Sequence, residues 1–118
     1  MKSRSQEMVR ALTEDNDVSA RMKTLKGSRA QNLPALLQRH GLLQVVAFLN
    51  AKASAKDGDS LDAKRDRELL NLLQHAVHAV EPEAKLSQAD LAKLATDRYL
   101  YLHELALEAA DWLARLAP

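Results

Sequence analysis

Two histidines have a spacing that could support metal chemistry. His75 and His78 lie three residues apart, so a helix would present them on neighbouring turns, where both could bind one metal ion. The sequence has no HExxH arrangement and no motif for a third ligand. We therefore expect both histidines to have structural roles, and we predict no metal site.

Carboxylates are the other candidates for catalysis. His103 and Glu104 are adjacent, and Glu108 and Asp111 lie three residues apart, as is common on the solvated face of a helix. Acid–base catalysis would require a desolvated carboxylate pair, which this pattern does not indicate. Three isolated glycines are too few for a phosphate-binding loop, and the chain lacks a nucleophile elbow. We predict no catalytic residue and no cofactor, so the protein is expected not to be an enzyme.

Basic residues are segregated along the chain. Residues 18–56 contain seven Lys or Arg residues and no Asp or Glu. The formal charge is −1 over residues 1–17, +7 over 18–56 and −5 over 57–118, for a net charge of +1. One face of the fold should therefore attract polyanions. A solvated basic face on an ordinary helical protein is the alternative, because the pI of 8.1 is below that of strongly basic nucleic-acid binders.

The basic span predicts a set of contacts to backbone phosphates. The predicted contacts are Lys23, Lys26, Arg29 and Arg39, with Lys52 and Lys56 as weaker candidates. They rest on charge alone. The chain has four aromatic residues, too few for the interleaved platforms on which single-stranded bases stack, so we do not expect sequence-specific readout of bases.

Composition predicts one all-α domain spanning residues 1–118. Ala, Leu, Gln, Lys, Arg and Glu dominate, and these residues lose little side-chain freedom in a helix. The length suits one hydrophobic core, and the absence of cysteine excludes disulfides and thiolate zinc sites. Neither a secretory signal nor a membrane span is evident, so we expect a soluble cytoplasmic protein.

The basic residues should lie on the first two helices. The apolar pattern predicts a helix over 5–26, which the polar residues 13–17 can interrupt, and a second helix over 33–52 that begins at Asn32-Leu33-Pro34. Gly41 within the second helix indicates either the close approach of a neighbouring helix or a bend, and we prefer close packing. A turn-rich segment over 53–60 predicts a mobile loop.

The acidic half should supply the remaining helices. A third helix begins at Leu61 and stops before Glu81-Pro82, because proline disfavours a helical residue ahead of it. Ser87 then caps a fourth helix that runs to the C-terminus, with a break at Thr96-Asp97 as an open alternative. The expected fold is a compact bundle of four to five helices.

Two blocks near opposite ends of the chain carry a pattern beyond helical periodicity. The first consists of Leu33-Pro34-Ala35-Leu36-Leu37, Gly41-Leu42-Leu43-Gln44 and Ala47-Phe48-Leu49. The second consists of Tyr99, Glu104, Ala106, Leu107, Trp112, Leu113, Arg115 and Ala117. Together they resemble the small helical subunit of type III-B (Cmr) CRISPR effector complexes. The chain departs from that family's pattern at Ala114, where Lys is usual, and at Leu105, which shifts the Glu-Ala step.

The resemblance implies a non-catalytic subunit that stacks in several copies along a guide-RNA ribonucleoprotein in antiviral defence. Its partners would be the guide and target RNA, the backbone and large subunits of the complex, and neighbouring copies of itself, with no membrane. The motif residues Leu33, Pro34, Gly41, Phe48, Tyr99 and Trp112 are interpreted as fold determinants. Arg115 matches the family's arginine, although an ion pair with Asp111 explains it equally well.

Three other functions stay open at this point. Small subunits of type III-A and type I effectors are also helical and basic. A helical regulator of duplex DNA would require a polar recognition helix, which we do not find. A protein-only adaptor would dock through the apolar run 42–49, and its basic residues would then serve solubility.

Overall fold

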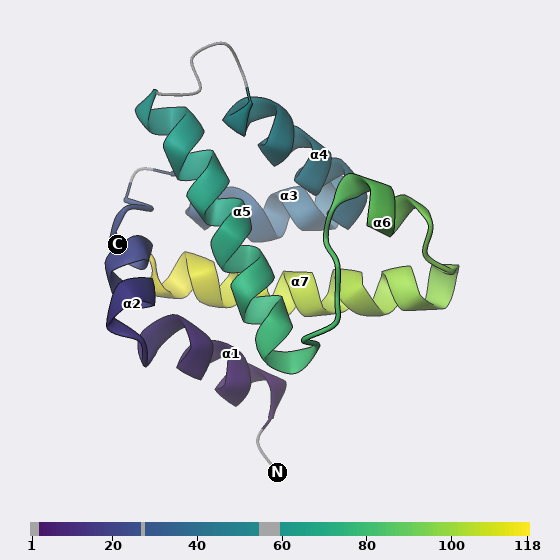
Figure 1. The fold of residues 1–118 in the computed structure, drawn as a ribbon, viewed down its shortest axis with the longest axis horizontal. Coiled ribbons are helices and arrows are strands. Elements are labelled where there is room, and N and C mark those ends of the chain that lie inside the picture. The colour runs from purple at the N-terminus through teal and green to yellow at the C-terminus, as the bar shows by residue number, and fades with distance from the viewer. Residues whose placement is uncertain (1–2, 27, 55–59) are drawn as a thin grey trace.

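The computed structural model describes residues 3–26, 28–54 and 60–118. Over these residues the chain forms seven α-helices, one 3-10 helix and no strand (Figure 1). The elements are α1 (Arg4–Thr13), α2 (Asn16–Lys23), η1 (Arg29–Asn32), α3 (Leu33–His40), α4 (Leu42–Ala53), α5 (Leu61–Val80), α6 (Gln88–Ala92) and α7 (Thr96–Leu116). The predicted all-α bundle is confirmed, with more helices than the four to five expected.

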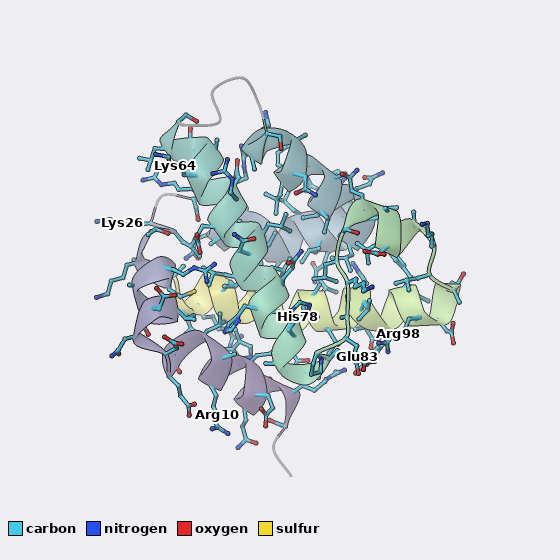
Figure 2. The ribbon with its side chains drawn as sticks, in the orientation of Figure 1. Arg10, Lys26, Lys64, His78, Glu83 and Arg98 are labelled. Carbon is cyan, nitrogen blue, oxygen red and sulfur yellow. The ribbon has the colours of Figure 1, made fainter. Side chains whose placement is uncertain are left out.

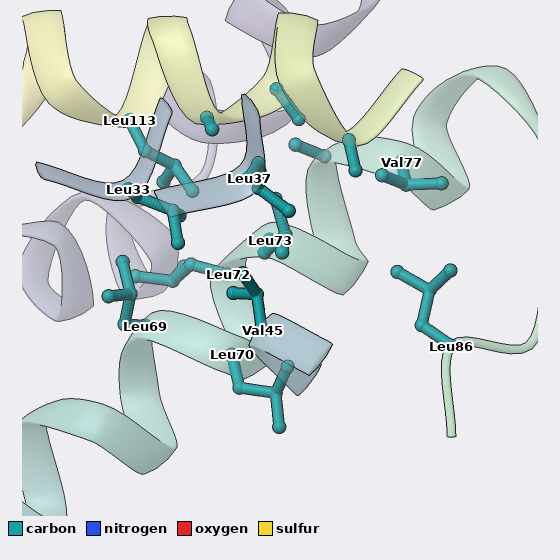
Figure 3. Packing of buried hydrophobic residues seen from close by; sticks show 14 of the residues in the cluster. Leu33, Leu37, Val45, Leu69, Leu70, Leu72, Leu73, Val77, Leu86 and Leu113 are labelled. Atoms are coloured by element: carbon teal, nitrogen blue, oxygen red, sulfur yellow. The ribbon is translucent and has the colours of Figure 1, made fainter. Parts of the chain in front are cut away.

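Helix α5 is the centre of the bundle. In Figure 1 it crosses the front of the molecule diagonally, and it packs against α1, α4 and α7. Its inward face carries most of its apolar residues, including Leu69, Leu72, Leu73, Ala76 and Val77, which are all fully buried (Figure 3). The predicted boundaries of this helix are confirmed, because it starts at Leu61 and stops before Glu81-Pro82.

Serine hydroxyls cap α5 and α6, and the sequence predicts the second of these caps, at Ser87. The Ser60 hydroxyl accepts a hydrogen bond from the Ala63 amide at 3.1 Å at the start of α5. The Ser87 hydroxyl accepts one from the Asp90 amide at 3.1 Å at the start of α6. Each bond satisfies an amide that has no partner inside the helix.

The predicted continuous helix over 33–52 is wrong. Gly41 has a φ of +83°, a conformation that side-chain-bearing residues rarely adopt, and it separates α3 from α4. The Tyr99 hydroxyl from α7 accepts a hydrogen bond from the Leu43 amide at 3.0 Å. A Cβ added at Gly41 would lie 3.3 Å from that hydroxyl. The glycine therefore makes a bend and also permits close approach of a neighbouring helix.

Two further breaks divide the predicted first and last helices. Asp15 accepts a hydrogen bond from the Asp17 amide at 2.8 Å and starts α2, so the interruption expected over 13–17 is confirmed. The last segment breaks over 93–95, just ahead of the expected position, and α7 starts at Thr96. The loop predicted over 53–60 contains the end of α4 and the Ser60 cap, and its residues 55–59 lie outside the described part of the chain.

Candidate nucleic-acid interface

Four of the six predicted phosphate contacts are exposed side chains. Lys23 ends α2, Lys26 follows it, Arg39 lies in the last turn of α3, and Lys52 lies in the last turn of α4. None of the four forms an ion pair with a described residue. Lys56 lies outside the described residues.

Arg29 differs from the other predicted contacts because it has partners inside the protein. Its Nε donates to the Asp66 carboxylate at 3.0 Å, which ties η1 to α5. Its guanidinium carbon lies 5.0 Å from the centre of the Phe48 ring on α4, and the Lys52 Nζ lies 5.7 Å from the same centre. The structure therefore brings Arg29 and Lys52 together, although 23 positions separate them in sequence.

Helix α5 adds cations that the sequence analysis missed. Lys64 and Arg67 are exposed in its first half, and Arg67 donates from Nη2 to the Ala53 carbonyl at the end of α4 at 3.0 Å. The sequence did not indicate these residues as contacts because they belong to residues 57–118, which have a net charge of −5. The local signal was present as Lys64-Arg65-Asp66-Arg67, three cations in four residues.

Two carboxylates of the described residues near these cations are already paired. Glu68 on α5 forms an ion pair with Arg21 on α2, and Asp62 lies 3.6 Å from Arg65. Such pairs cancel local negative charge that would otherwise repel a polyanion. We call the exposed residues Lys23, Lys26, Lys52 and Lys64, together with the half-buried Arg29, the basic end of the molecule.

Figure 2 shows how this charge is distributed. Lys26 and Lys64 point outward at the left of that view, while Glu83 and Arg98 lie at the right. Arg98 donates to the Glu81 carboxylate at 2.6 Å, and this hydrogen bond raises the pKa of Arg98 above its ordinary value. The positive charge of Arg98 is therefore paired with a carboxylate.

Arg39 is not part of the basic end. It lies at the opposite end of α3 from Arg29, a helix about 12 Å long at 1.5 Å per residue. An apolar groove of about 270 Å³ lies between α3 and α4. Its lining residues are Leu36, His40, Gln44, Val45 and Phe48. Arg39 is therefore separated from Arg29 by the length of α3 and by this groove.

His75, His78 and Glu108 make contacts that join separate parts of the fold. The His75 Nε2 contacts the Ala11 carbonyl at 3.0 Å, and the His78 Nε2 contacts the Ala84 carbonyl at 2.5 Å. Glu108 accepts a hydrogen bond from the Ser5 hydroxyl at 2.8 Å and so joins α7 to α1. Among the described residues there is no group of three His, Cys, Asp or Glu that could hold a metal ion.

Residues of the two sequence blocks meet in space. Gly41 and Leu43 from the first block contact Tyr99 from the second at the α3–α4 junction. Trp112 is half-buried, and the guanidinium of Arg115 lies 5.4 Å from the centre of its ring. Arg115 is therefore held by Trp112, and the ion pair with Asp111 suggested by sequence is not formed.

Comparison with known protein families explains the pattern that the two sequence blocks form. Residues 3–118 match the family described as CRISPR-associated protein (Cas_Cmr5). The chain belongs to this family. The resemblance to the small subunit of the type III-B Cmr complex is thereby confirmed over nearly the whole chain, well beyond the two blocks. No curated protein and no solved structure matches it.

Membership of the Cas_Cmr5 family selects among the alternatives that charge left open. The chain is a CRISPR-associated subunit of the Cmr type, and the assignment to type III-A or type I is set aside. No helix in the described part of the chain is long and apolar enough to cross a membrane.

Proposed function

We propose that this protein is a non-catalytic small subunit of the RNA-guided type III-B effector, acting in antiviral defence in the cytoplasm. Copies of it would stack along the backbone of the complex beside the guide RNA paired with target RNA. The basic end would contact backbone phosphates of that duplex, with Arg39 and Lys56 as further contacts. The large and backbone subunits would be its protein partners.

The observation that carries this proposal is the exposure of cations beside paired carboxylates. Lys23, Lys26 and Lys52 are exposed and form no ion pair with a described residue. Meanwhile Arg21 pairs with Glu68 and leaves no net negative charge there. Phosphates are the ligands that such a surface attracts, and their capture releases counterions. Specificity would come from base pairing with the guide, so the protein would need no contact with base edges.

Charge reversal tests the proposed contacts. We expect Lys23→Glu combined with Lys26→Glu to weaken binding to an RNA duplex at low salt. Each lost phosphate contact should make the slope of log affinity against log salt shallower by about 1, so the double variant should lose about 2. Fluorescence anisotropy of a labelled duplex at several salt concentrations measures both quantities.

A matched control separates a local contact from net charge. Lys85 and Lys93 are exposed near α6, away from the basic end, and neither forms an ion pair with a described residue. Lys85→Glu with Lys93→Glu changes the net charge by the same amount and should lower the affinity less. Equal losses in both double variants, or no loss in either, would count against the proposed surface.

A protein-only adaptor is the second candidate, and the apolar groove favours it. Phe48 is 38% exposed and lines that groove. However, Leu42, Val45, Val46 and Leu49 face the core, so the docking run predicted over 42–49 is mostly unavailable. Failure of the parent protein to bind an RNA duplex at low salt would make this candidate the stronger one.

A further inference from the structure

Phe48 holds two cations at one place on the surface. The guanidinium carbon of Arg29 and the Nζ of Lys52 lie 5.0 Å and 5.7 Å from the centre of its ring, so they are within about 11 Å of each other. The negative face of an aromatic ring attracts cations. The exposed Phe48 on α4 therefore has two cations as electrostatic partners.

Asp66 fixes the same arginine from the other side. It is 3% exposed and is the only buried polar or charged residue in the described part of the chain. Burial of a carboxylate is unfavourable unless it is paired, and Asp66 is paired with the Nε of Arg29 at 3.0 Å. No described residue accepts a hydrogen bond from the terminal nitrogens of Arg29.

These contacts orient Arg29 but do not use all of its hydrogen-bond donors. Its Nε is occupied and its guanidinium carbon lies over the Phe48 ring, while both terminal nitrogens remain as donors. A guanidinium with two such donors matches the geometry of a phosphate, and a nearby ammonium adds a point charge. Free side chains would separate through repulsion, whereas the folded protein holds them together.

We infer that Asp66 and Phe48 are positioning residues, which hold Arg29 and Lys52 as a two-cation clamp for one backbone phosphate of RNA. This inference rests on the proposed function and gives it a defined site. Neither Asp66 nor Phe48 touches the phosphate, and both act through the orientation of the cations. The clamp joins η1, α4 and α5, so it exists only in the folded bundle.

The substitution Asp66→Asn gives a test in which charge and positioning predict opposite changes in the affinity for RNA. Asp66→Asn removes a negative charge, and charge alone would therefore strengthen the binding of RNA. The amide oxygen of asparagine accepts a weaker hydrogen bond from the Arg29 Nε than the carboxylate does, so the loosened anchor should instead weaken binding by about two- to five-fold. Asp62→Asn is the matched control, because Asp62 lies one turn away and is exposed, and its neutralisation should strengthen binding slightly.

The ring is tested with two substitutions at an exposed position. Phe48→Leu keeps an apolar side chain but removes the aromatic face, and affinity for an RNA duplex should fall by about two- to five-fold. Phe48→Tyr keeps the face and should retain the affinity of the parent protein. Phe48 is partly exposed, so Phe48→Leu keeps the test open if Asp66→Asn does not fold.

Nuclear magnetic resonance of the Arg29 side chain supplies a readout that overall stability would not move. The Nε–Hε signal of Arg29 should be sharp and displaced by the ring in the parent protein, and it should shift on addition of duplex RNA. Phe48→Leu should remove the displacement while Phe48→Tyr retains it.

The outcomes separate this inference from the proposed function. If Lys23→Glu with Lys26→Glu weakens binding while Phe48→Leu and Asp66→Asn do not, the clamp is wrong and the proposed function stands. If the parent protein binds no duplex at low salt, both fail. Stronger binding by Asp66→Asn would show that the lost negative charge outweighs any effect on the orientation of Arg29, which overturns the positioning role.

Discussion

At the scale of single residues, Gly41 and Tyr99 explain why two distant blocks of sequence form one pattern. The Tyr99 hydroxyl accepts the hydrogen bond of the Leu43 amide at 3.0 Å, at the first turn of α4. That amide has no acceptor inside the helix, so the tyrosine acts as its cap. The glycine leaves room for the hydroxyl, because a Cβ there would lie 3.3 Å away.

Removal of this hydroxyl should have a measurable cost. Tyr99→Phe leaves the Leu43 amide without its partner, and we expect a loss of about 1 to 2 kcal/mol in the free energy of unfolding. Urea denaturation followed by circular dichroism measures it. Tyr101→Phe is the control, because no described residue hydrogen-bonds the Tyr101 hydroxyl, and its ring still faces Arg98. Equal stability of Tyr99→Phe and the parent protein would show that water replaces the cap without loss.

At the scale of elements, the bend between α3 and α4 should depend on glycine. Gly41 has φ and ψ of 83° and 163°, a region that other residues enter at a cost of about 1 to 3 kcal/mol. Gly41→Ala should therefore lower the free energy of unfolding by that amount, as measured by denaturation.

The combination with Tyr99→Phe identifies the source of this cost. Deletion of the hydroxyl relieves the contact with the new Cβ, so Gly41→Ala should cost less in a Tyr99→Phe background than in the parent protein. If the free-energy changes of the two substitutions simply add, the whole cost of Gly41→Ala comes from backbone strain.

The sequence predicted some elements fully and others only in part, for physical reasons. Helix α5 was predictable because its apolar residues recur every three to four positions and a serine and a proline mark its ends. The bend at Gly41 was not, since glycine inside a helical pattern is compatible with either outcome. The contact made at this bend is with Tyr99, which lies 58 positions away in sequence.

At the scale of the whole molecule, charge along the chain differs from charge on the surface. The sequence predicted a basic face from residues 18–56, and four of its side chains contribute to the basic end. Arg39 was assigned to the same surface because a count of charges along the chain does not show that the length of α3 separates Arg39 from Arg29. Lys64 was omitted because it belongs to an acidic span, although α5 packs against α4 and brings it near Lys52.

Pairing is the other property that a linear tally omits. Arg29 and Arg21 count as positive charges in sequence, yet each has a carboxylate partner on α5. The acidic half of the chain therefore neutralises part of the basic half within the fold. Cations that keep donors available to a phosphate, and not the total number of cations, should set the strength of polyanion binding.

The most direct test of the central proposal is co-elution of this protein with the backbone subunit of a type III-B complex assembled on its guide RNA. We predict incorporation of several copies per complex, and weaker incorporation of Lys23→Glu with Lys26→Glu than of the parent protein. A folded protein that elutes alone, with the assembled complex lacking it, would contradict the account and leave the groove beside Phe48 as the basis of a protein-only adaptor.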